Sequence, residues 1–169
     1  SNKSEVIDLT KGDNGKISFT SAQGVTVTYT FENEGYVIGY NVETPSLVGK
    51  SAILDWSYEH QIVEDNVKYS RTRTGISYYT TEEDYDKFGE SGVDESETLE
   101  EDVKWIAHRQ RFFLSAIIDE SSSFKKPKLR MTCADDEDLS TLKHTSFNTD
   151  FTLASKNDFL FSFSLSSPY

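Results

Sequence analysis

The sequence is poor in cysteine and in basic residues, and it contains no long hydrophobic run. Cys133 is the only cysteine among 169 residues, so a disulfide within the chain is excluded. The longest apolar runs, residues 112–114 and 116–118, are far shorter than the ~20 residues of a membrane-spanning helix. The N-terminus also lacks a basic region followed by an apolar stretch. We therefore expect a chain that does not itself span a membrane and that is an excised piece of a longer protein.

Acidic residues dominate the charge of the chain. Lys and Arg total 17 against 29 for Asp and Glu, which gives a net charge of −12. Such a surface repels phosphate backbones, so nucleic acid is not an expected partner. Hydrophobic residues make up 36% and aromatic residues 13% of the chain, which is too apolar for a disordered protein. The length suits one hydrophobic core, and we predict a single domain over residues 1–169.

Alternating apolar and polar residues predict β-strands along most of the chain. Residues 25–31 and 36–42 both alternate, and turn residues lie between them, so we predict an antiparallel hairpin. Residues 103–118 also fit helical spacing, but their β-branched and aromatic content favours a strand. The connections are short and polar, which indicates an all-β sandwich. Further strands are expected at residues 5–10, 15–20, 51–58, 75–80, 124–134, 142–149 and 157–165.

Four large aromatic residues lie on the apolar faces of these predicted strands. Large aromatic side chains contribute much of the buried area of a core. We therefore expect Trp56, Trp105, Tyr29 and Phe31 to be largely buried. Replacing Trp105 with alanine would then cost about 3–5 kcal/mol of stability.

Residues 82–102 concentrate the negative charge. They contain eleven acidic residues against Lys87 alone, a local net charge of −10. A block of like charges predicts an exposed, mobile acidic loop that leaves the sandwich. A calcium-binding loop is the alternative, and Asp84-x-Asp86 begins its pattern of alternate oxygen ligands. Phe88 and Gly89 do not continue that pattern, so the loop is the preferred interpretation.

The sequence offers no catalytic, cofactor-binding or metal-binding residues that we would assign. The histidines, His60, His108 and His144, are scattered and have no second ligand at metal spacing. No Gly-x-Ser-x-Gly nucleophile motif occurs, and Cys133 lies in a strand-like stretch where a small buried residue is expected. The glycines of residues 12–15 indicate a hairpin turn and not a phosphate-binding loop.

One cluster of basic residues surrounds Pro127. Lysine and proline discourage pairing with another chain, so the cluster is typical of a protected edge strand. The alternative is a contact with anionic lipid headgroups, where each basic residue contributes on the order of 1 kcal/mol. The cluster consists of Lys125, Lys126, Lys128 and Arg130.

A resemblance to a known family extends in order from about Ile17 to Phe163. The stretches that carry it are Gly-Val-Thr-Val-Thr-Tyr-Thr-Phe at 24–31, Gly-Tyr-Val-Ile-Gly-Tyr-Asn at 35–41, Leu-Asp-Trp at 54–56 and Ser-Tyr-Tyr at 77–79. A fifth stretch, 103–117, places a Trp before an aromatic pair and a small-apolar strand. Together they resemble the large periplasmic domain of the bacterial YidC membrane protein insertases, in a version similar to that of Bacteroides.

This resemblance implies a β-supersandwich of the galactose-mutarotase-like type, held in the periplasm by an inner-membrane protein. It implies a non-catalytic accessory domain that assists insertion and folding through protein or lipid contacts. The implied partners are the insertase transmembrane core of the same full-length chain, Sec translocon components and nascent membrane proteins. Strands that usually open the family's domain are not found here, nor are its closing helices, so we expect a truncated sandwich.

Two other functions fit the same fold. A carbohydrate-binding or mutarotase-like domain would need an acid and a base facing one sugar, and His60, His108 or His144 with a nearby Glu are the candidates. This alternative rests on the shape of the fold alone, which is a weak argument for function. A free-standing secreted sandwich without enzymatic activity is the third possibility.

Overall fold

The computed structural model describes residues 10–12, 15–31, 35–135 and 140–165, which form thirteen strands and one short helix. No helix among these residues is long and apolar enough to cross a membrane. The helix is α1 (Val67–Arg71), and the strands are β1 (Thr10–Gly12), β2 (Lys16–Thr20), β3 (Thr26–Phe31), β4 (Val37–Glu43), β5 (Ser51–Gln61), β6 (Gly75–Thr80), β7 (Tyr85–Phe88), β8 (Glu95–Thr98), β9 (Val103–Gln110), β10 (Phe113–Asp119), β11 (Lys125–Cys133), β12 (Thr141–Thr152) and β13 (Lys156–Leu165).

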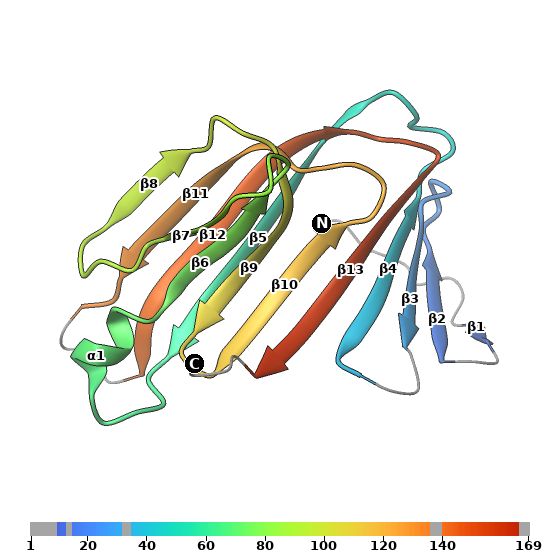
Figure 1. The fold of residues 1–169 in the computed structure, drawn as a ribbon. Coiled ribbons are helices and arrows are strands. Elements are labelled where there is room, and N and C mark those ends of the chain that lie inside the picture. The colour runs from blue at the N-terminus through green and yellow to red at the C-terminus, as the bar shows by residue number, and fades with distance from the viewer. Residues whose placement is uncertain (1–9, 13–14, 32–34, 136–139, 166–169) are drawn as a thin grey trace.

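The strands form two antiparallel sheets that pack face to face (Figure 1). The large sheet has the order β1-β2-β3-β4-β13-β10-β9-β6-β7, and the small sheet has the order β5-β12-β11-β8. The predicted all-β sandwich is therefore confirmed.

The core lies where the small sheet faces β6, β9 and β10. Ile76, Ile106 and Ile117 from the large sheet meet Leu129 and Phe147 from the small sheet, and all five are essentially inaccessible to solvent. Strand alternation explains this, because every second side chain of a strand faces the opposing sheet. The core therefore occupies the middle of the small sheet and only part of the large one.

Most of the predicted strands are present. The predicted hairpin is β3 and β4, with Tyr29 opposite Tyr40. Residues 103–118 form β9 and β10, so the strand interpretation is confirmed and the helical one is wrong. The stretch 5–10 lies outside the described residues except for its last member, which belongs to β1. Helix α1 was not expected; the Asn66 side chain caps it by accepting a hydrogen bond from the Tyr69 N–H at 3.0 Å.

The acidic segment 82–102 is not the continuous loop that its charge predicts. It contains β7, which pairs with β6, and β8, which pairs with β11. Phe88 and Leu99 are buried in the core cluster, whereas most of the acidic side chains face solvent. Charges placed on the outward side of an edge strand stay hydrated, so they do not prevent the segment from pairing. The burial of two apolar residues then attaches it to the sandwich.

The four aromatic residues expected in the core are less buried than predicted. Phe31 is 41% exposed, and Tyr29, Trp56 and Trp105 are only partly buried. In β9 the side chains of Val103 and Ile106 face the core. Trp105 lies between these two residues in the sequence, but its ring packs against Tyr79 on the outer face of the large sheet. Alternation places these residues on one face of a strand, but it does not show whether another sheet covers that face.

The large sheet extends beyond the small one. No residue of β2, β3 or β4 is buried, whereas five of the six residues of β6 are. Figure 1 shows β1 to β4 standing to one side of the small sheet. The inner face of β3 and β4 is therefore open along the edge of the small sheet.

Candidate binding groove

An apolar groove of about 420 Å³ lies where the edge of the small sheet meets the open face of the large sheet. Strands β3, β4, β13 and β10 form its floor, and β5 forms its wall. Its apolar character comes from the alternating aromatic and aliphatic residues of the floor strands. The groove is lined by Tyr29, Ile38, Tyr40, Leu54, Asp55, Trp56, Tyr58, Ser115, Ile117, Phe161 and Phe163.

Aromatic contacts connect the floor of the groove to its wall. Tyr29 lies opposite Tyr40 across β3 and β4, with ring centroids 5.1 Å apart. Tyr40 contacts Phe161 at 5.4 Å, and Phe161 contacts Trp56 of the small sheet at 5.6 Å. Burial raises the pKa of the Tyr40 hydroxyl, and the neighbouring Tyr29 raises it further. The floor is thus a row of rings that presents faces and edges to any occupant.

The wall of the groove is an open strand edge. Strand β5 pairs with β12 over its whole length, and it is the terminal strand of the small sheet. Among the described residues no strand pairs with its other side, so that side presents backbone groups that can pair with an additional strand. Asp55 is the single charged residue of the lining, and its carboxylate accepts a hydrogen bond from Asn148 Nδ2 at 3.2 Å.

Beneath the wall, the structure brings together two of the three histidines. His60 Nε2 lies 2.8 Å from Thr145 Oγ1, and His108 Nδ1 lies 2.7 Å from the same oxygen. His144 lies on the outer face of the small sheet, with Nδ1 3.8 Å from Glu59 Oε2 and both side chains about half exposed. The only ion-pair contact between a histidine and a carboxylate among the described residues is therefore this one, away from the groove.

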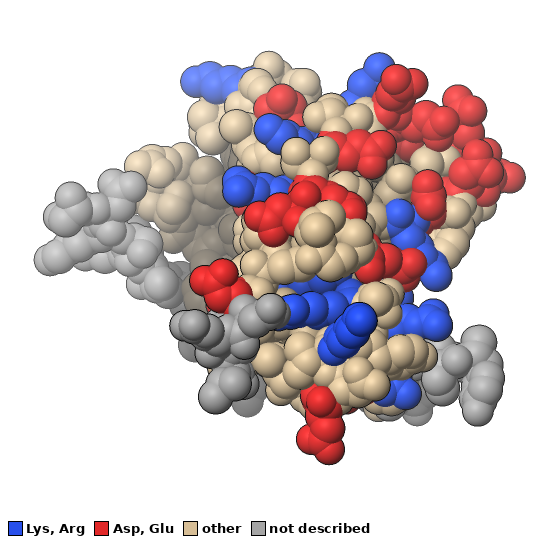
Figure 2. All heavy atoms as spheres, turned by 90° about the vertical axis from the view of Figure 1, so that its left-hand side faces the viewer, with Lys and Arg blue, Asp and Glu red and all other residues tan. Residues whose placement is uncertain are grey.

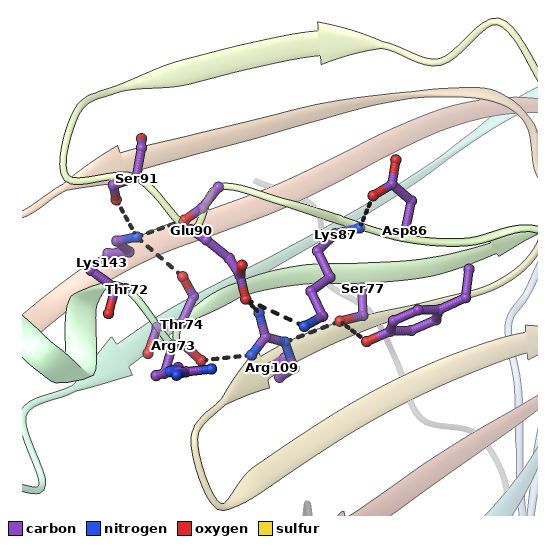
Figure 3. Close-up of polar contacts among 12 residues, drawn as sticks. Thr72, Arg73, Thr74, Ser77, Asp86, Lys87, Glu90, Ser91, Arg109 and Lys143 are labelled. Atoms are coloured by element: carbon purple, nitrogen blue, oxygen red, sulfur yellow. Dashed lines mark hydrogen bonds and ion pairs between the residues drawn. The ribbon is translucent and has the colours of Figure 1, made fainter. Parts of the chain in front are cut away.

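Lys143 is a buried lysine whose role the sequence did not indicate. Its Nζ donates hydrogen bonds to the carbonyl oxygens of Gly89 at 2.6 Å, Ser91 at 2.6 Å and Thr74 at 3.1 Å (Figure 3). Burial lowers its pKa to about 8, so it remains charged at neutral pH. Three acceptors match the three protons of an ammonium group. Lys143 thus attaches the turn after β7 to the core.

Arg109 holds the same turn from the outer face of the large sheet. Its guanidinium pairs with Glu90, and it donates to Ser77 Oγ and to the Arg73 carbonyl, both at 3.0 Å (Figure 3). Lys87 adds a longer contact with Glu90 at 3.8 Å. Lys143 therefore attaches the first part of the acidic segment from the core side, and Arg109 attaches it from the outer face of the large sheet.

Acidic side chains gather at the end of the sandwich formed by β7 and β8. Figure 2 looks at this end and shows carboxylates over much of it. A cleft of about 490 Å³ opens there, and Tyr78 lies in it with its hydroxyl 3.4 Å from Asp86 Oδ2. Burial and these acidic neighbours raise the pKa of Tyr78 to about 12. Within the described part of the chain, no three His, Cys, Asp or Glu residues form a group that could hold a metal ion.

The basic cluster around Pro127 does not protect a sheet edge. Strand β11 lies between β12 and β8, so the edge-strand interpretation is wrong. Pro127 falls at an irregularity in the ladder between Lys125 and Lys128, where a missing N–H is tolerated. Lys125 pairs with Asp102 at 2.7 Å, and Lys128 and Arg130 are exposed. The alternative, a contact with anionic lipid headgroups, stays a prediction.

The family model and the similar proteins found by comparison all indicate the same family. The family model for the YidC periplasmic domain matches residues 1–157. Membrane protein insertase YidC of Cytophaga hutchinsonii is 26% identical over 118 residues, which cover 64% of this chain and 19% of that protein. The Bacteroides fragilis insertase is 25% identical over 121 residues, with 68% and 19% covered, and that of Chlorobium luteolum is 26% identical over 113 residues, with 62% and 19% covered.

These relatives agree with the Bacteroides-type resemblance seen in the sequence. The matched part of this chain spans about a fifth of the length of each of the three. The family model covers well over half of the chain, and its description agrees with the antiparallel sandwich. The chain belongs to the family of YidC periplasmic domains, the periplasmic part of an inner-membrane protein insertase.

Proposed function

We propose that this domain is a non-catalytic accessory module of the insertase, and that it assists membrane protein insertion and folding by binding protein segments in the groove along β5. The observation that carries the proposal is the combination of an open strand edge with an aromatic floor. An extended segment can pair with such an edge while its alternate side chains enter the pockets beside it. An apolar surface of this kind is typical of an interaction site.

The proposed partners follow from the family and from the surface of the domain. They are the transmembrane core of the same full-length chain, nascent membrane proteins and Sec translocon components. Lys128 and Arg130 support a weaker, salt-sensitive contact with anionic headgroups, because exposed charges are screened beyond about 8 Å at physiological ionic strength.

Photocrosslinking from the groove tests this function in the full-length insertase. A photoreactive phenylalanine analogue replaces Tyr58, which lines the groove and is 39% exposed, or Tyr85, which lies on β7 and is 52% exposed. We expect crosslinks to a nascent membrane protein or to another insertase component from position 58 and few from position 85. Equal crosslinking from both positions, or none from position 58 during active insertion, would contradict binding in the groove.

A further inference from the structure

The two buried histidines join the two sheets of the sandwich. His60 comes from β5 and Thr145 from β12, both in the small sheet, whereas His108 comes from β9 in the large sheet. All three are almost completely inaccessible to solvent. The 2.7 Å contact between His108 and Thr145 is therefore a polar link across the interior of the sandwich, directly behind the wall of the groove.

This link depends on neutral imidazole rings. A threonine hydroxyl has one proton, so when it donates to one ring, the other ring must donate to its oxygen. The remaining nitrogens, His60 Nδ1 and His108 Nε2, are buried and have no hydrogen-bond partner among the described residues. A protonated imidazole has two N–H donors and needs two acceptors. The Gln110 side chain acts on His60 and the Trp56 backbone acts on His108, but neither forms a hydrogen bond of full geometry with the remaining ring nitrogen.

Within the described part of the chain, the charged groups that act on the pair are all basic, and the Tyr58 ring packs against both imidazoles, with centroids 4.9 Å from His60 and 5.5 Å from His108. The charged groups that act on His60 are Lys143 and His144 of β12 and Arg109 of β9, and His60 in turn acts on His108. In the ladder, β6 and β10 place the uncharged Ile76 and Ser115 opposite His108.

The pKa values of both rings follow from this environment. Burial lowers the pKa of His60 to about 4 and that of His108 to about 3. Contacts with the Gln110 side chain and the Trp56 backbone act in the opposite direction and do not offset burial.

We propose that His60, Thr145 and His108 form an acid-sensitive link between the sheets, which opens when the rings take up protons and loosens the small sheet from the large one beside the groove. In an opened state both rings return to an ordinary pKa near 6.5, so acid favours opening. At pH 5, protonation of one ring then raises the equilibrium constant for opening about 30-fold, and protonation of both rings raises it about a thousandfold. Groove geometry thus becomes a function of the pH on its side of the membrane.

Trp56 provides a direct reporter of the link. Its ring lies 4.5 Å from the His108 ring, edge to face, and the sequence has only one other tryptophan. In a Trp105→Phe background, Trp56 fluorescence is followed from pH 7.5 to 4.5, together with circular dichroism. We expect a reversible change in Trp56 fluorescence with a midpoint below pH 6 and an uptake of more than one proton. No change down to pH 4.5 would overturn the proposal.

Matched variants separate the histidines from other titrating groups. His60→Gln keeps a polar atom at the Nε2 position and His108→Asn keeps one at the Nδ1 position, and neither titrates. We expect the double variant to lose the transition and the control His144→Gln to keep it; a transition unchanged in the double variant would refute the link. If that variant does not fold, histidine ring NMR signals of the parent decide, because titration of both rings near pH 6.5 within the folded state contradicts the proposal.

Discussion

Replacing Lys143 with methionine tests how the acidic segment is attached to the core. Methionine keeps the approximate length and apolar stem of lysine but removes the donor, which leaves the carbonyls of Thr74, Gly89 and Ser91 without their partner. Thr74 and Gly89 are buried, and an unsatisfied buried acceptor costs about 1–3 kcal/mol. Relief of the desolvated ammonium recovers part of this cost. We expect a net loss of about 3 kcal/mol.

Urea unfolding at pH 7 measures this loss, and hydrogen exchange locates it. The amides of residues 89–94 should exchange faster in Lys143→Met, because that turn loses its attachment from the core side. Lys87→Met is the matched control, since Lys87 is 40% exposed and contacts Glu90 only at 3.8 Å. That control should change stability by less than about 0.5 kcal/mol. If Lys143→Met is as stable as the control, or if exchange at residues 89–94 is unchanged, Lys143 does not attach this turn to the core.

Three further predictions concern pH, packing and catalysis. Lys143 has a pKa of about 8 in the folded state against 10.5 for a free lysine, so the unfolded state binds more protons between these pH values. The free energy of unfolding should therefore rise by about 2 kcal/mol from pH 7 to 9.5. Urea titrations of Lys143→Met should show no such rise. Trp56→Ala should cost more stability than Trp105→Ala, about 3 against about 1–2 kcal/mol, because Trp56 bridges the sheets and Trp105 packs on the outer face; equal melting of the two variants would contradict this assignment. We expect polarimetry on aldoses to show no rate above buffer, and a rate that disappears in His60→Gln, His108→Asn or His144→Gln would restore the mutarotase-like alternative.

Local sequence signals predicted the strands because they depend on neighbouring residues. The alternation in β3 and β4 and the turn between them specify a hairpin without further information. The alternating Phe159, Phe161 and Phe163 likewise predicted β13. What could not be predicted is which of these faces is covered, because that depends on how far the small sheet extends. The groove is therefore the consequence of a difference in sheet size, and no local pattern encodes it.

The polar contacts of the interior depend on long-range register. His60, His108 and Thr145 meet only because β5, β12 and β9 align in two different sheets. Lys143 takes an inward position of β12, where composition alone would place a lysine in solvent. The prediction of a loop at the acidic segment was wrong for a related reason. Its net charge indicates a solvated loop, but the burial of two apolar residues, Phe88 and Leu99, attaches it to the sandwich.

As proposed above, this domain assists an insertase without performing the insertion itself. The most direct test removes residues 15–165 from the full-length protein, keeps the segment that joins the domain to the membrane core, and measures insertion of a membrane protein substrate. We expect much of the insertion activity to remain, with a reduction limited to substrates that use the groove. Complete loss of insertion by a shortened protein that is stable and correctly placed in the membrane would contradict the accessory role.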